Sequence, residues 1–237
     1  MLLVSCAVTP AKEHSAEWSY SGDSAPYHWG EVKSDFKACA EGKFQSPVNL
    51  QRMKSTVLKH PIHFSYSDIS GSVHNNGHAL VVSFDDKAYV ELEGIRFYLR
   101  QLHFHVKSEH ALEGLFYPAE LHVVHEDQNR QLLVLGFLLE INDEDFDRYG
   151  FFAALPEVGE TVHGAKIALE KLVRINGGHF YYRGSLTTPP CTEGVRWVIF
   201  DKHIRLSSEQ LSRLEALYPN NYRPLRPLNG RPLYHAE

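Results

Sequence analysis

The stretch Gln101-Leu102-His103-Phe104-His105 alternates polar and hydrophobic residues. Side chains of a β-strand alternate between its two faces, so Gln101, His103 and His105 share one face. A second stretch, Glu120-Leu121-His122, places a carboxylate two residues before a third imidazole. Three imidazoles that project from rigid strands form an open zinc site, in which the fourth position is left for water. The two stretches therefore predict β-strands that carry a metal centre.

A His-x-His pair by itself is weak support for a metal, because the chain contains 15 histidines. The apolar neighbours of the three histidines imply burial, and buried imidazoles need polar partners. Gln101 and Glu120 then have a role, since each metal-bound histidine needs an acceptor for its other ring N–H. His125 lies on the opposite strand face from His122, so we expect it to be solvated. No His-Glu-x-x-His motif occurs, which argues against a zincin protease.

Composition limits the class of protein. A chain of 237 residues with 43% hydrophobic residues can bury one sizeable core, and an all-β domain of this length is ordinarily undivided. The formal net charge is −5 and the basic residues are dispersed, so no nucleic-acid or anionic-lipid footprint is present. No apolar run reaches the roughly 18 residues of a membrane-spanning helix. A small molecule is the expected partner.

The N-terminal segment and the cysteines bear on the compartment. Residues 1–17 show no periodicity, and residues 18–237 form the expected domain. Cys6 follows Met-Leu-Leu-Val-Ser, which fits either the remnant of a lipoprotein or secretory signal or a disordered N-terminus with an incidental cysteine. The first interpretation predicts a periplasmic or secreted protein that is lipid-anchored through Cys6. Cys39 and Cys191 are a candidate pair, but spacing alone leaves their pairing open.

Short strand-like runs recur between turn signals, which is typical of an antiparallel sheet. Asn76-Gly77 and Glu93-Gly94 are the turn candidates, and Asn76-Gly77 is the stronger hairpin signal. Residues 132–139 are almost wholly apolar, which predicts a strand buried on both faces. The expected strands are residues 61–66, 72–75, 78–84, 88–93, 95–106, 119–125, 131–139 and 195–200.

Helical signals are few. Ser207 and Gln210 resemble a capping box, and leucines follow at helical spacing, so we predict a surface helix over 208–217. Residues 146–155 and 164–174 are expected to form short helices. Residues 21–47 read as a long loop packed over the core by its aromatic side chains. The proline-containing tail over 220–233 should wrap the surface without regular structure.

Several motifs, taken together, resemble the α-class carbonic anhydrases, and most of all their secreted bacterial members. The resemblance runs from Trp18 to Pro232 in the family's order. One such motif would be weak support, but five functional motifs in the correct order make the match highly specific. The motifs are Gln101-Leu-His-Phe-His105, Ser108-Glu-His110, Ala119-Glu-Leu-His122, Asn75-Asn-Gly-His-Ala79 and Ser185-Leu-Thr-Thr-Pro-Pro190, framed by Trp18-Ser-Tyr20, His28-Trp-Gly30, Gln45-Ser-Pro47, Val195-Arg-Trp197 and Asn221-Tyr-Arg-Pro224.

The resemblance implies a fold and a metal site. The expected fold is mainly β, or α+β by content: a single domain with a large twisted, mostly antiparallel central sheet and short peripheral helices. His103, His105 and His122 would hold Zn²⁺. Gln101 would accept a hydrogen bond from His103 and Glu120 one from His122, while a backbone carbonyl would serve the remaining ligand.

The resemblance also assigns roles around the metal. Thr187 and Glu109 would orient the nucleophile, Thr188 would contact bicarbonate or an inhibitor, and His78 would carry the proton out. From the residues alone, Thr187 is a loop threonine before a Pro-Pro turn and His78 an exposed histidine. Tyr20 and Asn76 match the residues that order water along the proton path. A hydrophobic wall for carbon dioxide would comprise Val124, Val134, Leu186, Val195 and Trp197, all of which any β core would also contain.

The implied function is zinc-dependent, reversible hydration of carbon dioxide to bicarbonate and a proton, by a zinc-bound hydroxide with a histidine proton shuttle. The resemblance further implies inhibition by sulfonamides and small anions, a monomer or homodimer, and a disulfide between Cys39 and Cys191. A catalytically silent zinc-binding relative that acts as a binding module is the alternative. Such a protein is expected to have lost a zinc ligand or Thr187, and all are retained here. Zinc storage gives no reason for Thr187, Glu109 and His78.

Overall fold

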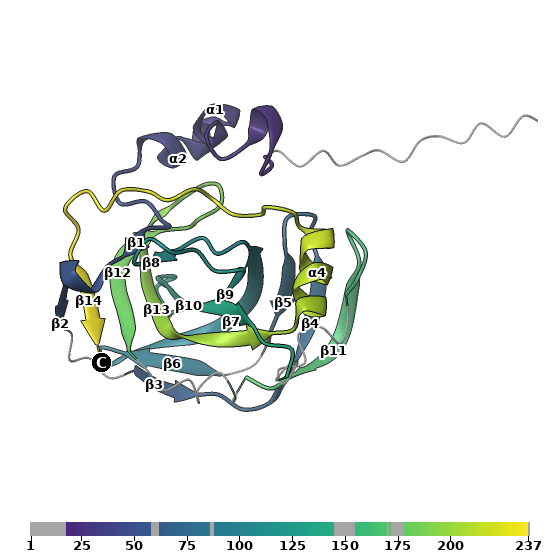
Figure 1. Ribbon diagram of the computed structural model, residues 1–237. Coiled ribbons are helices and arrows are strands. Elements are labelled where there is room, and N and C mark those ends of the chain that lie inside the picture. Colours follow the sequence, from purple (N-terminus) through teal and green to yellow (C-terminus); the bar gives the residue numbers. More distant parts are fainter. Residues whose placement is uncertain are drawn as a thin grey trace, which may run out of the picture.

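Strands dominate the molecule, and most belong to one twisted, 12-stranded sheet (Figure 1). The computed structural model describes residues 18–57, 62–85, 88–144, 155–169, 171 and 178–236. The strands are β1 (Asn49–Leu50), β2 (Ser55–Val57), β3 (Ile62–Ser65), β4 (Ile69–Asn75), β5 (Leu80–Ser83), β6 (Tyr89–Leu92), β7 (Ile95–Val106), β8 (Ala111–Leu112), β9 (Ala119–Glu126), β10 (Leu132–Ile141), β11 (Thr161–Ile167), β12 (His179–Ser185), β13 (Glu193–Leu206) and β14 (Leu233–Ala236). The helices are α1 (Trp29–Val32), α2 (Ala38–Glu41) and α4 (Ser208–Leu217), with 3₁₀ turns η1 (Gly22–Ser24), η2 (Ser34–Phe36) and η3 (Arg52–Lys54).

The order of strands in the sheet places β7 and β9 near its centre. The main path is β11-β4-β5-β7-β9-β10-β13-β12-β14-β2, and β6 joins β3 to β7. Most neighbours are antiparallel, whereas β10–β13 and β14–β2 are parallel. The antiparallel register of β7 and β9 sets His103 directly opposite His122. The two histidine-bearing stretches are thus adjacent because they form neighbouring strands.

β10 is the buried central strand that its apolar run predicts. It lies between β9 and β13, and its alternate residues enter different hydrophobic clusters. Leu133, Leu135 and Phe137 belong to the larger cluster, whereas Val134 and Leu138 belong to the cluster on the other face. The sheet is therefore packed on both sides, and the second cluster borders the metal site described below.

Both predicted turns are present, but they differ in form. Glu93 and Gly94 alone connect β6 to β7, with φ values of 56° and 75°. These positive angles are typical of the two-residue hairpin turns that match strand twist. Asn76-Gly77 belongs to the longer 76–79 connection between β4 and β5. Both turn predictions were therefore correct. The two-residue turn, however, is at Glu93-Gly94, which has the weaker hairpin signal in the sequence.

Two predictions about secondary structure were wrong. Residues 164–167, expected to be helical, form the end of β11, which pairs with β4 at one edge of the sheet. Pairing along this edge outweighs a local helical pattern. Residues 21–47, expected to be irregular, contain α1, α2 and two 3₁₀ turns. The helix expected over 146–155 lies almost entirely outside the described residues.

The C-terminal helix α4 agrees with its prediction. The Ser207 hydroxyl accepts a hydrogen bond from the Gln210 backbone N–H, and the Gln210 side chain accepts one from the Ser207 N–H. This reciprocal capping satisfies two donors at the start of the helix. The tail that follows has no regular structure until β14, which extends the sheet beside β12.

His125 is a further correction, because it is fully buried rather than solvated. β9 lies between β7 and β10 and is covered on both faces, so the face opposite His122 is also core. The Tyr66 hydroxyl lies 2.5 Å from His125 Nε2, and their rings are stacked. Burial lowers the pKa of His125 to about 3, so the imidazole is neutral.

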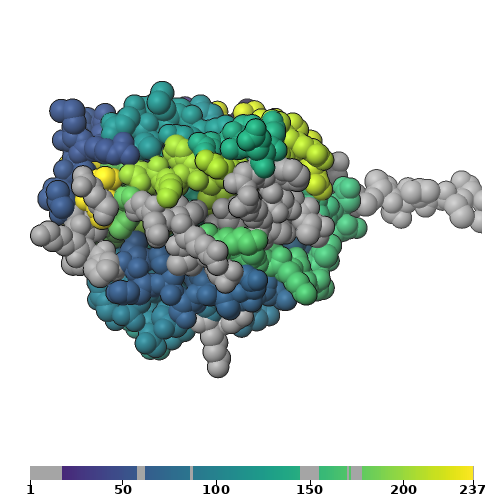
Figure 2. Space-filling view, turned by 60° about the horizontal axis from the view of Figure 1, so that its bottom comes forward, coloured from purple at the N-terminus to yellow at the C-terminus, as the bar shows by residue number. Residues whose placement is uncertain are grey.

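Segments from distant parts of the chain meet on the outer surface of the sheet. In Figure 2, blue segments from the first third of the chain lie beside green segments from its last third, consistent with the pairing of β4 and β11. Within the residues described, no helix combines the length and apolar character needed to cross a membrane.

Candidate metal centre and active site

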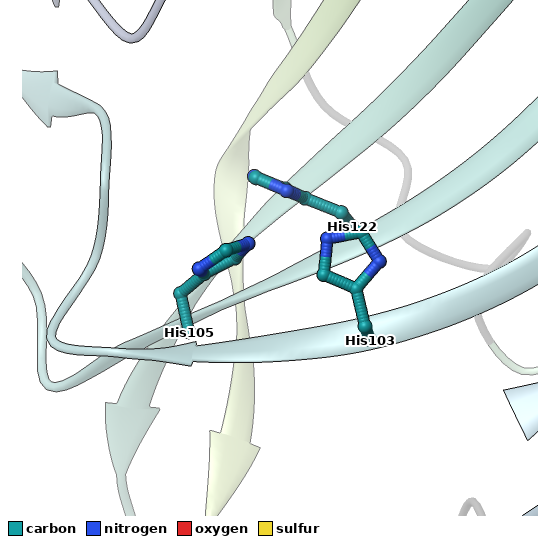
Figure 3. Close-up of side chains that lie close together, drawn as sticks. All are labelled: His103, His105 and His122. Carbon is teal, nitrogen blue, oxygen red and sulfur yellow. The ribbon is translucent and has the colours of Figure 1, made fainter. Parts of the chain in front are cut away.

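Three imidazoles converge at the centre of the sheet (Figure 3). His103 and His105 project from β7 and His122 from the neighbouring β9, and their ring centroids are 4.6 to 5.1 Å apart. One nitrogen of each ring lies within 4.8 Å of the corresponding nitrogens of the other two. His105 and His122 are buried and His103 is partly buried. The strand alternation of β7 therefore does place two imidazoles on one face, directly opposite a third.

The second nitrogen of each ring is held by a group that accepts hydrogen bonds. His103 Nδ1 donates to Gln101 Oε1 at 2.8 Å, and His122 Nε2 donates to Glu120 Oε1 at 2.9 Å. His105 Nδ1 donates to the backbone carbonyl of Asn221 at 2.6 Å. Because each acceptor fixes the proton on one nitrogen, the other nitrogen of each ring presents a lone pair.

These three lone pairs fit a zinc ion. His105 Nε2 is buried and has no hydrogen-bond partner, which is costly unless another group completes it. Burial lowers the pKa of His103 and His122 and brings that of His105 to about 4, so all three rings are neutral at physiological pH. Three neutral imidazole nitrogens with oriented partners form the ligand set of a catalytic zinc site.

Glu120 organises the shell behind His122. Its Oε1 also accepts from His110 Nδ1 at 2.7 Å, and its Oε2 accepts from the backbone N–H groups of Glu109 and His110. Burial acts to raise the pKa of Glu120, but its interactions with His110 and His122, including their hydrogen bonds, outweigh burial and hold that pKa well below its usual range. His110, Glu120 and His122 also lie close enough together for a metal. In this second group the facing atoms are already hydrogen-bonded to one another. His103, His105 and His122, each with a free lone pair, therefore form the better candidate for metal binding.

The hydrogen-bonded chain continues beyond His110 through Tyr182, Ser46 and Ser185, to which the sequence analysis gave no individual role. His110 Nε2 lies 2.7 Å from the Tyr182 hydroxyl, which lies 2.8 Å from the Ser46 hydroxyl. Ser46 and Ser185 exchange two backbone-to-hydroxyl hydrogen bonds. The carboxylate behind His122 is thus braced by segments far away in the chain.

Glu109 lies beside the triad and is fully buried. Its Oε2 is 3.5 Å from His105 Nε2, and its Oε1 accepts a hydrogen bond from the Arg223 backbone N–H at 2.8 Å. Burial raises the pKa of Glu109 to about 7, although His122 and a hydrogen bond from Thr187 act in the opposite direction. The Thr187 side chain therefore lies close to Glu109, which itself lies beside the imidazoles.

The expected hydrophobic wall gathers in one cluster. Val134, Val195 and Trp197 are buried members of it, and Val124 and Leu186 pack against it. The Trp197 ring lies 4.8 Å from that of His122. These five side chains come from three strands and the loop after β12, so the sheet places an apolar surface beside the metal centre.

His78 lies at the edge of the site in the β4–β5 connection and is half-buried. Its ring stacks on Trp18, with centroids 3.8 Å apart and planes 9° apart. Burial lowers its pKa. Tyr20 lies 6.4 Å from the His78 ring, while Asn76 Oδ1 accepts hydrogen bonds from the backbone N–H groups of His78 and Ala79. Asn76 thus shapes the turn that carries His78.

A disulfide anchors the loop that carries Thr187 and Thr188. Cys39 in α2 and Cys191 form a disulfide with a Cα–Cα distance of 5.0 Å, across 152 residues of sequence. The Cys191 backbone N–H donates to the Thr188 carbonyl, which closes the loop as a turn. The pairing that spacing alone left open is therefore present.

Asn221 is the most important residue to which sequence reasoning gave no role. Besides the carbonyl that holds His105, its side chain accepts from the Val106 N–H at 2.7 Å. The same side chain donates to the carbonyls of His78 and Phe104, both at 3.0 Å. One residue of the C-terminal tail thus joins the metal-binding strand to the His78 turn. Its motif was among those of the resemblance, but no local pattern reveals these contacts.

The fold and the site define a class: a β-sheet protein with a three-histidine cluster that could hold a metal ion, beside a buried Thr–Glu pair and an apolar wall. Comparisons with known proteins agree. The profile of the eukaryotic-type carbonic anhydrase family matches residues 24–237. The carbonic anhydrase of Klebsiella pneumoniae is 34% identical over 236 residues, which cover 97% of this chain and 95% of that protein.

A solved structure and a plant relative extend the comparison. The structure of α-carbonic anhydrase from Thermovibrio ammonificans in complex with sulfanilamide superimposes with a TM-score of 0.87 at 37% identity, and the match covers 93% of this chain and 98% of that one. A dioscorin of Dioscorea polystachya is 30% identical over 247 residues, covering 98% of this chain and 90% of its own.

The chain belongs to the eukaryotic-type, or α-class, carbonic anhydrase family, and it is a carbonic anhydrase enzyme. The family resemblance read from the motifs is therefore confirmed, as is the expected fold.

Proposed function

We propose that this protein catalyses the zinc-dependent, reversible hydration of carbon dioxide to bicarbonate and a proton. The observation that carries the proposal is the convergence of three imidazole nitrogens, each freed for ligation because an acceptor holds the opposite nitrogen of the same ring. His103 Nε2, His105 Nε2 and His122 Nδ1 would hold the zinc ion. A zinc ion in such a site supplies Lewis-acid chemistry that makes hydroxide available near neutral pH, as is established for carbonic anhydrases.

Thr187 and Glu109 orient the reacting oxygen. Glu109 is acceptor-only when ionised, and one of its oxygens already receives the Arg223 N–H. A hydroxyl hydrogen bonded to that carboxylate must use its own proton in the bond, so Thr187 can only accept from the reacting group. This fixes the direction of the group's lone pair toward the substrate, while Thr188 contacts the bicarbonate product.

Carbon dioxide is small and apolar, so its binding needs an apolar surface more than directed hydrogen bonds. The Val124, Val134, Leu186, Val195 and Trp197 cluster supplies this surface beside the triad. The proton must leave the site after each turnover, and an imidazole at its mouth is suited to carry it. His78 takes this role, with Tyr20 and Asn76 close by.

Sulfonamides and small anions are expected to inhibit the enzyme by occupying the position of the reacting oxygen. The sulfanilamide complex of the Thermovibrio relative supports this expectation. A periplasmic or secreted location is proposed because the Cys39–Cys191 disulfide suits an oxidising compartment. The catalytically silent alternative receives no support from the site, since the triad, Thr187 and Glu109 are all retained.

Metal analysis combined with stopped-flow hydration of carbon dioxide tests the proposal. We expect one zinc per chain, and hydration activity that is lost on chelation and restored by zinc. A matched variant is His103→Ala, which removes one ligand at the partly buried edge of the triad, with the exposed His28→Ala as control. Zinc-loaded protein without hydration activity would contradict the enzymatic function and leave the binding-module alternative.

A further inference from the structure

A hollow of 440 Å³ lies near one edge of the sheet. It is bordered by β12 and β14, which pair at the side of the sheet opposite β11 (Figure 1). Tyr182 of β12 faces the catalytic side, where it contacts His110. Its neighbours Tyr181 and Arg183 point the other way, because side chains alternate along a strand, and both line the hollow.

The walls of the hollow are aromatic. Tyr181 and Tyr234 are register partners on β12 and β14, with ring centroids 6.0 Å apart. Phe44 is 48% exposed and, with Pro232, completes the apolar lining. A volume of several hundred Å³ with apolar walls and a few polar groups is characteristic of small-molecule sites. The dimensions suit a planar ligand of one or two fused rings.

Positive charge dominates the polar part of the lining. Arg183 and Arg231 border the hollow, and Glu93 is the one acidic side chain among its lining residues. Arg231 donates its hydrogen bonds to backbone carbonyls, those of Arg183, Gln45, Pro227 and Leu228. Carbonyl groups satisfy the N–H donors but carry no net charge. The guanidinium therefore remains a fixed positive charge beside the cavity.

A third arginine strengthens the positive field. Arg196 of β13 is the register partner of Arg183 and is only 9% exposed, and its Nε and Nη1 atoms have no hydrogen-bond partner. Burial raises the pKa of Tyr181, and the charge of Glu93 raises it further, while Arg183 and Arg196 lower it. The charges of Glu93, Arg183 and Arg196 therefore all act on the Tyr181 hydroxyl. In the part of the chain that the structure describes, no carboxylate forms an ion pair with Arg183, Arg196 or Arg231.

We propose that this hollow is a second, non-catalytic binding site for a small aromatic carboxylate. The carboxylate accepts charge-assisted hydrogen bonds from Arg183, while Arg231, whose N–H donors are mostly used by backbone carbonyls, adds its positive charge. The ring lies between Phe44 and the two tyrosines. A single carboxylate is favoured over a dianion, because Glu93 faces the same space.

Calorimetric titration with 2-naphthoate tests the site. The neutral isostere 2-naphthamide is the chemical control, since it keeps the ring and removes the charge. Titrations are made on zinc-loaded protein with and without saturating sulfanilamide, and on zinc-stripped protein, because a carboxylate can also bind the metal. Binding at the hollow must be saturable and unaffected by sulfanilamide or by zinc removal. The result is therefore independent of whether the proposed hydration activity is found.

Two variants locate the binding. Arg183 is exposed, and Arg183→Gln keeps part of its aliphatic stem and a polar, uncharged end, so the fold should be unaffected. Naphthoate affinity should fall about tenfold with the loss of one charged contact. Arg213→Gln, on the exposed face of α4, is the matched control and should bind like the parent. Phe44→Ala should weaken binding by removing one wall. Absence of saturable binding, equal affinity for naphthamide, or an unchanged affinity in Arg183→Gln would each overturn the proposal.

Discussion

Replacing Asn221 with alanine should damage both the fold and the metal site. The change removes three side-chain hydrogen bonds, to the Val106 N–H and to the carbonyls of Phe104 and His78. The Val106 and Phe104 groups belong to a buried strand, and a buried polar group left without a partner costs about 1–3 kcal/mol. The free energy of unfolding should therefore fall by about 2–6 kcal/mol, a large share of the ~5–15 kcal/mol typical of a folded protein.

Zinc affinity should fall as well. The Asn221 carbonyl remains in the variant, but the side chain that holds it against His105 is gone. Loss of an oriented partner behind a metal ligand commonly weakens metal binding about 10–100-fold. Urea unfolding followed by tryptophan fluorescence measures the first effect, and competition with a chromophoric chelator measures the second.

Asn229→Ala is the matched control for this prediction. Asn229 is exposed and its side chain makes one hydrogen bond, to the Lys43 carbonyl at 2.9 Å. Its replacement removes this exposed hydrogen bond and puts alanine at a φ of 52°, so the free energy of unfolding should fall by about 1 kcal/mol, which is less than the fall expected for Asn221→Ala. If Asn221→Ala unfolds at the same urea concentration as Asn229→Ala and binds zinc as the parent does, the assigned role of Asn221 is refuted.

Further predictions concern other parts of the molecule. His125 has a pKa of about 3 when folded against 6.5 when unfolded, so the unfolded state binds more protons between these values; the free energy of unfolding should decrease as pH falls from 6.5 toward 3, by at most ~5 kcal/mol. Urea titrations over this range should show a shallower slope for His125→Gln. Opening the Cys39–Cys191 disulfide, which spans 152 residues, should cost about 5 kcal/mol on a chain-entropy estimate, measured by unfolding with and without reductant. His78→Ala should slow hydration in weak buffer and recover with added imidazole, whereas an unchanged rate would show that protons leave by another route.

The grouping of the three histidines could be predicted because the pattern that places them is local. Strand alternation places His103 and His105 on one face, and a polar acceptor two residues away accompanies both His103 and His122. Asn221 could not be found in this way, because its carbonyl reaches His105 across 116 residues of sequence. Such a contact depends on the path of the C-terminal tail, which has no periodicity to read.

The failures have physical reasons too. His125 was expected to be solvated because it faces away from His122, yet a strand in the middle of this sheet has no solvated face. Residues 164–167 were expected to be helical, but the free edge of β4 supplies hydrogen-bond partners that a local pattern does not contain. The expectation that Thr187 and Glu109 orient the nucleophile came from the family resemblance, because no local pattern indicates it. The structure adds that the two side chains lie close together beside the three histidines.

The disulfide has a consequence for biogenesis. Cys39 is synthesised early and Cys191 follows 152 residues later, so the bond cannot form until most of the chain has emerged and the sheet has brought α2 to the Thr187 loop. Oxidation is thus a late step that acts on an almost complete molecule. A chain truncated or stalled before Cys191 would lack both the crosslink and the loop it secures, which ties the finished active site to completed synthesis and to oxidation of the two thiols.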